Sequence, residues 1–134
     1  CPGYQWPFIF KEINKFIENL TNTYPIELSG STMGTGLGAS WGLHYSSFSD
    51  GLIKKTNLIN PGNLDYLNAE TLSIRVSNFP IYIYHTSDNY EAENSTEFKS
   101  SMMDNGKYDI FVEQFELDEK EFINTKLTQL NIFV

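Results

Sequence analysis

The chain has 134 residues, with a hydrophobic content of 40% and an aromatic content of 15%, and these values predict a single globular domain over residues 1–134. Its formal net charge of −8 disfavours general nucleic-acid binding, because phosphate would be repelled. No apolar run approaches the roughly 20 residues that a membrane-spanning helix needs, and the single cysteine, Cys1, excludes an intrachain disulfide.

Residues 7–20 carry one apolar stripe at helical spacing, with polar residues on the other side. Pro7 suits the first position of a helix, and Asn22 and Pro25 are typical of its end. The pattern predicts an amphipathic helix that packs on the core. Its apolar positions are Ile9, Ile13, Phe16, Ile17 and Leu20.

The stretch 29–47 is the most regular in the chain, because small or polar residues alternate with apolar ones. A period of two is typical of β-strands, so this stretch predicts two strands, at about 26–33 and 37–47, joined as a hairpin. One face of these strands is nearly bare glycine. Such a face indicates a close approach, by a helix laid across the sheet or by a sharp bend more often than by a ligand.

The middle of the chain alternates between patterned and unpatterned segments. Residues 48–69 lack a period and predict a surface loop. Alternation over 70–76 and the apolar run 81–84 each predict a strand, whereas the polar segment 87–101 predicts another loop.

Residues 108–117 have apolar side chains on both faces, which predicts a strand in the centre of the sheet. Asp118 and Glu121 have the spacing of a capping box, so a second helix is expected to begin there, and 131–134 predicts a last short strand. The order is helix, several strands, helix, without alternating β-α units. It predicts an α+β fold, with a mostly antiparallel β-sheet of about five strands flanked by an N-terminal and a C-terminal helix.

One motif matches a catalytic pattern. Residues Gly38–Gly42 have the G-x-S-x-G spacing of the nucleophile elbow of α/β-hydrolases. An elbow needs a sharp turn from a strand into a helix, whereas the alternation here continues as a strand. His44, the nearest candidate base, would lie roughly 13 Å from Ser40 on such a strand. We therefore rank a hydrolase that uses Ser40, or a histidine and a carboxylate, last among the functional hypotheses.

Neither a cofactor nor a metal is expected. The glycines at 34, 36 and 38 lack the spacing of a dinucleotide fingerprint or a phosphate loop. His44 and His85 have no third ligand at a fixed spacing, so each is better explained as a histidine bonded to backbone or water. No pair of carboxylates is favoured by its spacing for acid–base catalysis.

Acidic residues concentrate between Asp88 and Glu121. This segment holds eleven acids and three bases, which accounts for the entire net charge of −8. A regional charge of this kind indicates either a solubilising surface or a surface that steers a basic partner. The residues that we select as partner-binding are Tyr90, Tyr108, Asp109, Glu113, Glu116, Asp118, Glu119 and Glu121.

The first functional hypothesis is a non-enzymatic binding protein whose acidic segment engages a basic protein. A small, acidic chain with no supported catalytic motif is similar in type to bacterial immunity proteins, which neutralise nuclease toxins. The likeness is one of overall profile and rests on no specific motif. It implies a basic protein partner, such as a nuclease-type toxin, and no nucleic acid.

The alternative hypothesis is an extracytoplasmic lipoprotein or small-ligand-binding module anchored through Cys1. Mature bacterial lipoproteins begin with a lipid-carrying cysteine, and the glycine face or a cavity under a helix would then hold the ligand. Because the first helix is expected to start by Pro7, almost no tether would separate a lipid from the fold. We therefore favour an ordinary chain boundary and a cytoplasmic location.

Overall fold

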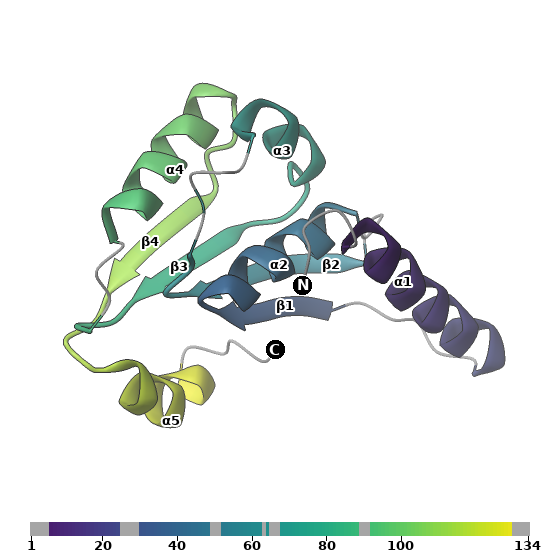
Figure 1. Ribbon diagram of the computed structural model, residues 1–134, viewed down its shortest axis with the longest axis horizontal. Coiled ribbons are helices and arrows are strands. Elements are labelled where there is room, and N and C mark those ends of the chain that lie inside the picture. The colour runs from purple at the N-terminus through teal and green to yellow at the C-terminus, as the bar shows by residue number, and fades with distance from the viewer. Residues whose placement is uncertain are drawn as a thin grey trace.

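The computed structural model describes residues 6–24, 30–48, 52–62, 64, 68–88 and 92–129. Helices and strands alternate along these residues (Figure 1). The elements are α1 (Trp6–Thr23), β1 (Gly30–Thr35), α2 (Leu37–Ser47), β2 (Ile53–Ile59), α3 (Ala69–Arg75), β3 (Ile81–His85), α4 (Ala92–Asp104), β4 (Ile110–Gln114) and α5 (Glu119–Gln129).

The four strands form one sheet in the order β1-β2-β3-β4, and every neighbouring pair is parallel. The fold is therefore α/β, and the expectation of an α+β fold with a mostly antiparallel, five-stranded sheet is wrong. Parallel neighbours need a crossover connection, and α2, α3 and α4 supply the three that this sheet requires.

The sheet has a hydrophobic cluster on each face. On one face, residues of α2, α3 and α4 pack on inward-facing strand residues such as Leu58, Ile81 and Ile83. On the other face, Phe122 and Leu127 of α5 pack with Ile59 and Tyr84. The alternation of Ile83 and Tyr84 between the two clusters follows from the period of two in a strand.

Helix α2 occupies the segment predicted as the second strand of a hairpin, 37–47. Its buried residues are Ala39, Ser40, Leu43 and Ser46, at helical spacing. Trp41 and Tyr45 face the opposite way and pack on Phe10 of α1, with ring centroids 6.2 and 5.6 Å apart. Because α2 has apolar residues on two faces and serines at two buried positions, apolar and polar residues alternate along its sequence, and this alternation resembles the period of a strand.

Three further predictions in the middle of the chain are wrong. The expected loop 48–69 contains β2, the expected strand 70–76 is helix α3, and the expected loop 87–101 contains most of α4. Helix α3 buries Leu72 and Ser73, and the residue after it, Val76, is also buried, whereas Ile74, which supported the strand prediction, is exposed. The side chain of Asn68 accepts a hydrogen bond from the Thr71 N–H at 3.1 Å and so caps the start of α3.

Other predictions are confirmed. Helix α1, strand β3 and helix α5 lie where the periodicity placed them. The expectation that the apolar stripe of α1 packs on the core is wrong, because Ile13 and Phe16 are 40% and 63% exposed and Phe10 is buried instead. The Asp118 carboxylate accepts a hydrogen bond from the Glu121 N–H at 2.8 Å, which is one half of the predicted capping box. Strand β4, however, is at the edge of the described sheet and not at its centre, and 131–134 lies outside the described residues.

Candidate functional site

The carboxyl ends of parallel strands are the usual place for a functional site in an α/β fold. At the end of β1 the chain turns sharply into α2, and Gly36 is the residue at this turn, with φ 55° and ψ −125°. Its N–H donates to the Ile59 carbonyl at 3.1 Å, and its own carbonyl accepts from the Gly62 N–H at 3.1 Å. These bonds fix the turn against the end of β2.

The glycines on either side of the turn allow the backbone of α2 to pass close to β1. A Cβ on Gly34 would lie 2.5 Å from the carbonyl oxygen of Gly38, so only glycine fits at position 34. The glycine face of β1 therefore accommodates a helix, which is one of the two explanations that its composition favoured.

This turn has the pattern and geometry of a nucleophile elbow, in which G-x-nucleophile-x-G forms a strained turn from a strand to a helix. The matching residues are Gly34–Gly38, and the central position holds Gly36. The prediction that no strand-to-helix turn occurs here is wrong, but the turn lies upstream of the Gly38–Gly42 motif. Ser40 is buried inside α2, where its hydroxyl donates to the Gly62 carbonyl. The elbow thus presents no nucleophilic side chain.

A polar network lies beyond the ends of β2 and β3. The Asn60 side-chain amide donates to the Thr86 hydroxyl at 2.9 Å and to the Glu119 carboxylate at 3.1 Å. The Thr86 hydroxyl in turn donates to Asp88, which also accepts the Glu119 N–H at 3.1 Å. Together these bonds attach the start of α5 to the sheet.

Asp88 follows β3 and comes after the elbow in the chain. In α/β-hydrolases the catalytic residues follow one another in the order nucleophile, acid, histidine, so Asp88 has the position of the acid. Hydrogen bonds from the Thr86 hydroxyl and the Glu119 N–H lower the pKa of this carboxyl from its ordinary value of 3.8. The two histidines of the chain, His44 and His85, both precede Asp88. No histidine therefore follows the acid in the order that an elbow enzyme of this type uses.

The lowered pKa of Asp88 predicts a pH-dependent stability. Because the folded pKa is depressed, the stabilisation by Asp88 is present above about pH 4 and is lost as pH falls through the folded pKa. The variant Asp88→Asn is expected to be less stable than the parent chain at pH 7, with the difference shrinking below pH 3.8. Urea unfolding at the two pH values measures this difference. Asp104→Asn, on an exposed end of α4, is the matched control, and an equal effect of both variants would contradict the assignment.

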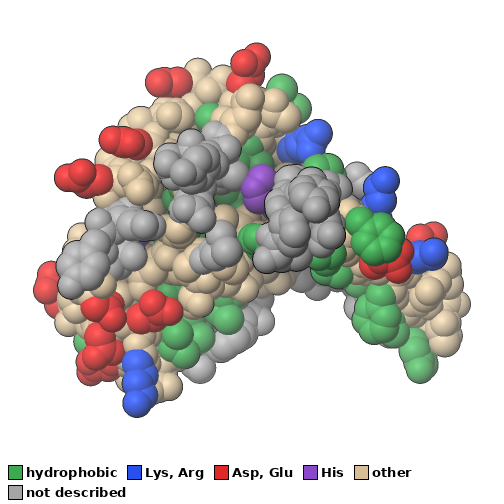
Figure 2. All heavy atoms as spheres, viewed as in Figure 1, with side chains coloured by type: hydrophobic (Ala, Val, Ile, Leu, Met, Phe, Trp, Pro, Cys, Tyr) green, Lys and Arg blue, Asp and Glu red, His purple; other side chains and the backbone are tan. Residues whose placement is uncertain are grey.

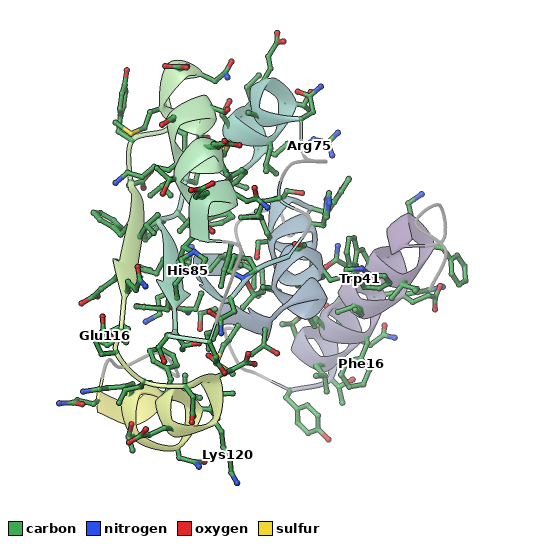
Figure 3. The ribbon with its side chains drawn as sticks, turned by 60° about the vertical axis from the view of Figure 1, so that its left-hand side comes forward. Phe16, Trp41, Arg75, His85, Glu116 and Lys120 are labelled. Atoms are coloured by element: carbon green, nitrogen blue, oxygen red, sulfur yellow. The ribbon has the colours of Figure 1, made fainter. Side chains whose placement is uncertain are left out.

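The acidic segment forms one side of the molecule, because the strand order follows the chain order. Residues 88–121 run from the end of β3 through α4 and β4 into α5, and so occupy one end of the sheet. Figure 2 shows Asp and Glu side chains over α4 and around α5, and the Lys and Arg side chains visible in this view lie near α1, α3 and α5. In Figure 3, Glu116 lies near α5 and Arg75 at the opposite end of the view. We call the surface of α4, β4 and the start of α5 the acidic side.

The selected acids of this side fall into two groups. Asp109 pairs with Lys107 at 2.6 Å, Asp118 caps α5, and Glu119 accepts the bond from Asn60. These three have structural partners. The other three selected acids, Glu113, Glu116 and Glu121, are exposed and have no ion pair among the described residues.

Two exposed aromatic residues accompany the acids. Tyr108, selected from the sequence, is 69% exposed just before β4, whereas Tyr90 lies outside the described residues. Phe111, which was not selected, is 49% exposed on β4 and stacks on Tyr82 with ring centroids 5.3 Å apart. In the described chain, β4 pairs only with β3, so its other edge has no strand partner. Because the sequence analysis placed this strand at the centre of the sheet, it did not predict an edge without a strand partner.

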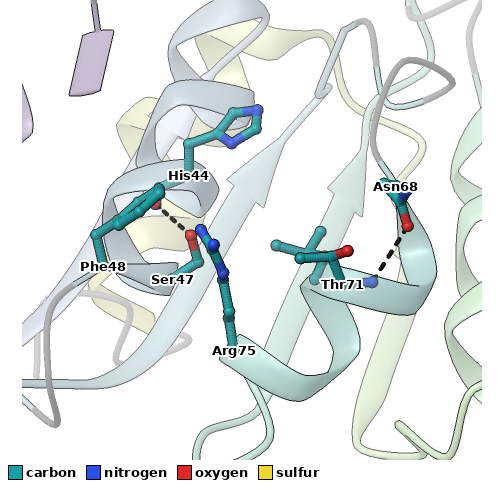
Figure 4. A pocket seen from close by; sticks show the side chains of 7 residues that line it. His44, Ser47, Phe48, Asn68, Thr71 and Arg75 are labelled. Carbon is teal, nitrogen blue, oxygen red and sulfur yellow. Dashed lines mark hydrogen bonds between the residues drawn. The ribbon is translucent and has the colours of Figure 1, made fainter.

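A small pocket lies on the helical face, between the end of α2 and α3 (Figure 4). Its volume is about 110 Å³. Helix α2 and the residue after it contribute His44, Ser47 and Phe48. Asn68 and α3 contribute the remaining walls, which are Asn68, Thr71, Leu72 and Arg75. Burial lowers the pKa of His44, so its ring is neutral at pH 7.

The described residues contain no group of three or more His, Cys, Asp or Glu side chains arranged to hold a metal ion. Within the same residues, no helix combines the length and apolar character needed to cross a membrane. Cys1 lies outside them. No known family model matches the chain, and a search of curated proteins found no significant relative.

Proposed function

We propose that this protein is a non-enzymatic binding protein whose acidic side engages a basic protein, in the manner of an immunity or inhibitor protein. The observation that carries the proposal is the position of the net charge. The acids lie around β4, the edge strand of the described sheet, with exposed Phe111 on this strand and exposed Tyr108 just before it, so one surface offers charge, apolar anchors and backbone hydrogen-bonding groups.

The two kinds of group have different roles in such a complex. Exposed acids such as Glu113, Glu116 and Glu121 raise the association rate with a basic partner, and their effect weakens as salt increases. Tyr108 and Phe111 supply the aromatic contacts that typically dominate binding energy at the centre of an interface. The edge of β4 that has no strand partner in the described part of the chain allows a segment of the partner to add to the sheet.

The turn at Gly36 supports a role without catalysis. A strand-to-helix elbow serves a hydrolase by exposing a nucleophile, and glycine cannot provide one. Ser40, the serine of the Gly38–Gly42 motif, is buried and bonded to the Gly62 carbonyl. The architecture at the carboxyl ends of the strands thus holds the backbone of an elbow without its reactive group.

A capture experiment with charge variants tests the proposal. The acid variant combines Glu113→Gln, Glu116→Gln and Glu121→Gln, and the control variant combines Glu12→Gln, Glu18→Gln and Glu70→Gln. Both lose three exposed charges, one of them in the first turn of a helix. Each immobilised protein is exposed to lysate of the source organism at low and high salt, and captured proteins are identified by mass spectrometry.

We expect the parent chain and the control variant to retain the same basic protein at low salt. Exposed charges are each worth about 0.2–1 kcal/mol, so the acid variant should bind it about tenfold more weakly, mainly through slower association. Equal affinity of the acid and control variants would contradict the proposal. So would a partner whose binding does not weaken as salt is raised.

A further inference from the structure

We propose that the pocket between α2 and α3 binds a small carboxylate, held by the guanidinium group of Arg75. The pocket is distinct from the acidic side, because none of its lining residues belongs to α4, β4 or α5, although α3, which forms one wall, packs against α4 (Figures 1 and 4). Its volume of about 110 Å³ is several times the ~10–15 Å³ that one water molecule requires. A compound of several heavy atoms therefore fits.

Arg75 is the only arginine in the chain, and it lines this pocket. Its Cζ lies 4.6 Å from the centroid of the Phe48 ring, a cation–π contact that holds the guanidinium at the pocket wall. Among the described residues, the guanidinium has neither an ion-pair partner nor a hydrogen-bond acceptor. Its planar set of N–H donors is therefore available to a ligand.

The charge of the pocket selects an anion with a single negative charge. No Asp or Glu is among the described residues that line it, and His44 is neutral at pH 7. Within the described part of the chain, the positive charge of Arg75 therefore has no acidic side chain beside it in the pocket. A carboxylate matches this charge and also matches the guanidinium in shape, because the two planar groups form paired hydrogen bonds.

The other walls indicate what the carboxylate is attached to. Leu72 and the Phe48 ring give the pocket an apolar surface next to the cation. Thr71 and Asn68 add a hydroxyl and an amide to the wall formed by the start of α3. A short aliphatic or aromatic carboxylate combines these features, whether it is a free metabolite or the C-terminus of a peptide.

An NMR titration of the ¹⁵N-labelled chain tests this site. The probes are benzoate and propionate, with benzamide as the neutral counterpart of benzoate and inorganic phosphate as the competing anion. An N-acetylated dipeptide with a free C-terminal carboxylate, compared with its amide, tests the peptide source. We expect saturable shifts of the signals of His44, Thr71 and Arg75, with benzoate binding at least tenfold more tightly than benzamide.

Charge variants identify the contact. Arg75→Gln is expected to weaken benzoate binding at least tenfold, and Arg75→Lys, which keeps the charge without the planar fork, should weaken it less. Lys120→Gln, which removes a charge from exposed α5, should leave binding unchanged. Tighter binding of the dipeptide acid than of benzoate would assign the site to a peptide C-terminus, and the reverse to a free compound.

Three results would overturn the proposal. They are equal binding of benzoate to the parent chain and to Arg75→Gln, tighter binding of phosphate than of any carboxylate, and the absence of saturable shifts near the pocket by about 10 mM of each carboxylate. Each of these results would leave the proposed role of the acidic side unaffected, because the two surfaces share no residue.

Discussion

Replacing Gly34 with alanine is expected to lower the free energy of unfolding by about 2–3 kcal/mol. The new methyl group would lie 2.5 Å from the Gly38 carbonyl oxygen and close to the backbone nitrogen of Ala39. These are backbone atoms of the first turn of α2, so they cannot move aside as a flexible side chain would. Thermal unfolding followed by circular dichroism should show a decrease in Tm of roughly 8 °C.

Gly38→Ala is the matched control for this substitution. Gly38 is on the other side of the same close approach, but a Cβ there would meet nothing within 4 Å. Since alanine is a better helix former than glycine, this variant should be more stable than the parent chain by about 0.5 kcal/mol. A loss of stability in both variants, or in neither, would show that α2 does not cross β1 as described.

The substitution Phe122→Ala should be more damaging, with a loss of about 3–4 kcal/mol in the free energy of unfolding. Phe122 is fully buried, and its ring centroid lies 5.7 Å from that of Tyr84 and 5.1 Å from that of Phe115. Truncation leaves a cavity between α5 and the sheet. Urea unfolding monitored by fluorescence measures the loss.

The neighbouring residue provides the comparison for Phe122. Ile123 is on the same helix but is 37% exposed, so Ile123→Ala should cost less than about 1 kcal/mol. A weakened α5 also loosens Glu119, which bonds to Asn60 and to Asp88. Hydrogen exchange of the α5 amides should therefore accelerate more in Phe122→Ala than in Ile123→Ala. Similar exchange in both variants would contradict the packing of α5 on this face.

Sequence periodicity located α1, β3 and α5, but it did not predict which apolar side chains of α1 are buried, since Ile13 and Phe16 of its stripe are exposed. Helix α1 has one apolar stripe and helix α5 a capping signal, and both were placed correctly. Helices α3 and α4 were missed because serines occupy buried positions, Ser73 in the first and Ser95 in the second. Serine is counted as polar in a hydrophobic pattern, so a buried serine interrupts the apolar spacing by which a helix is recognised.

The candidate sites were predicted in part, for reasons that differ between them. The acidic side could be predicted because its residues are close in sequence, and a sheet with sequential strand order keeps them close in space. The network around Asp88 could not be predicted from the sequence, because the bonding partners of Asn60 are separated from it by 26 and 59 positions in the chain. The elbow was assigned to the wrong residues, since its defining feature at Gly36 is a backbone angle and not a side chain.

The sequential order of the strands also has a consequence for how the chain folds during its synthesis. Each strand pairs with the strand that follows it in the chain, so no completed strand has to wait for a partner made much later. A chain emerging from the ribosome can build the sheet one β-α unit at a time, from β1 toward β4. The acidic side is then the last part to form. A partner that binds there would select molecules whose sheet is already complete.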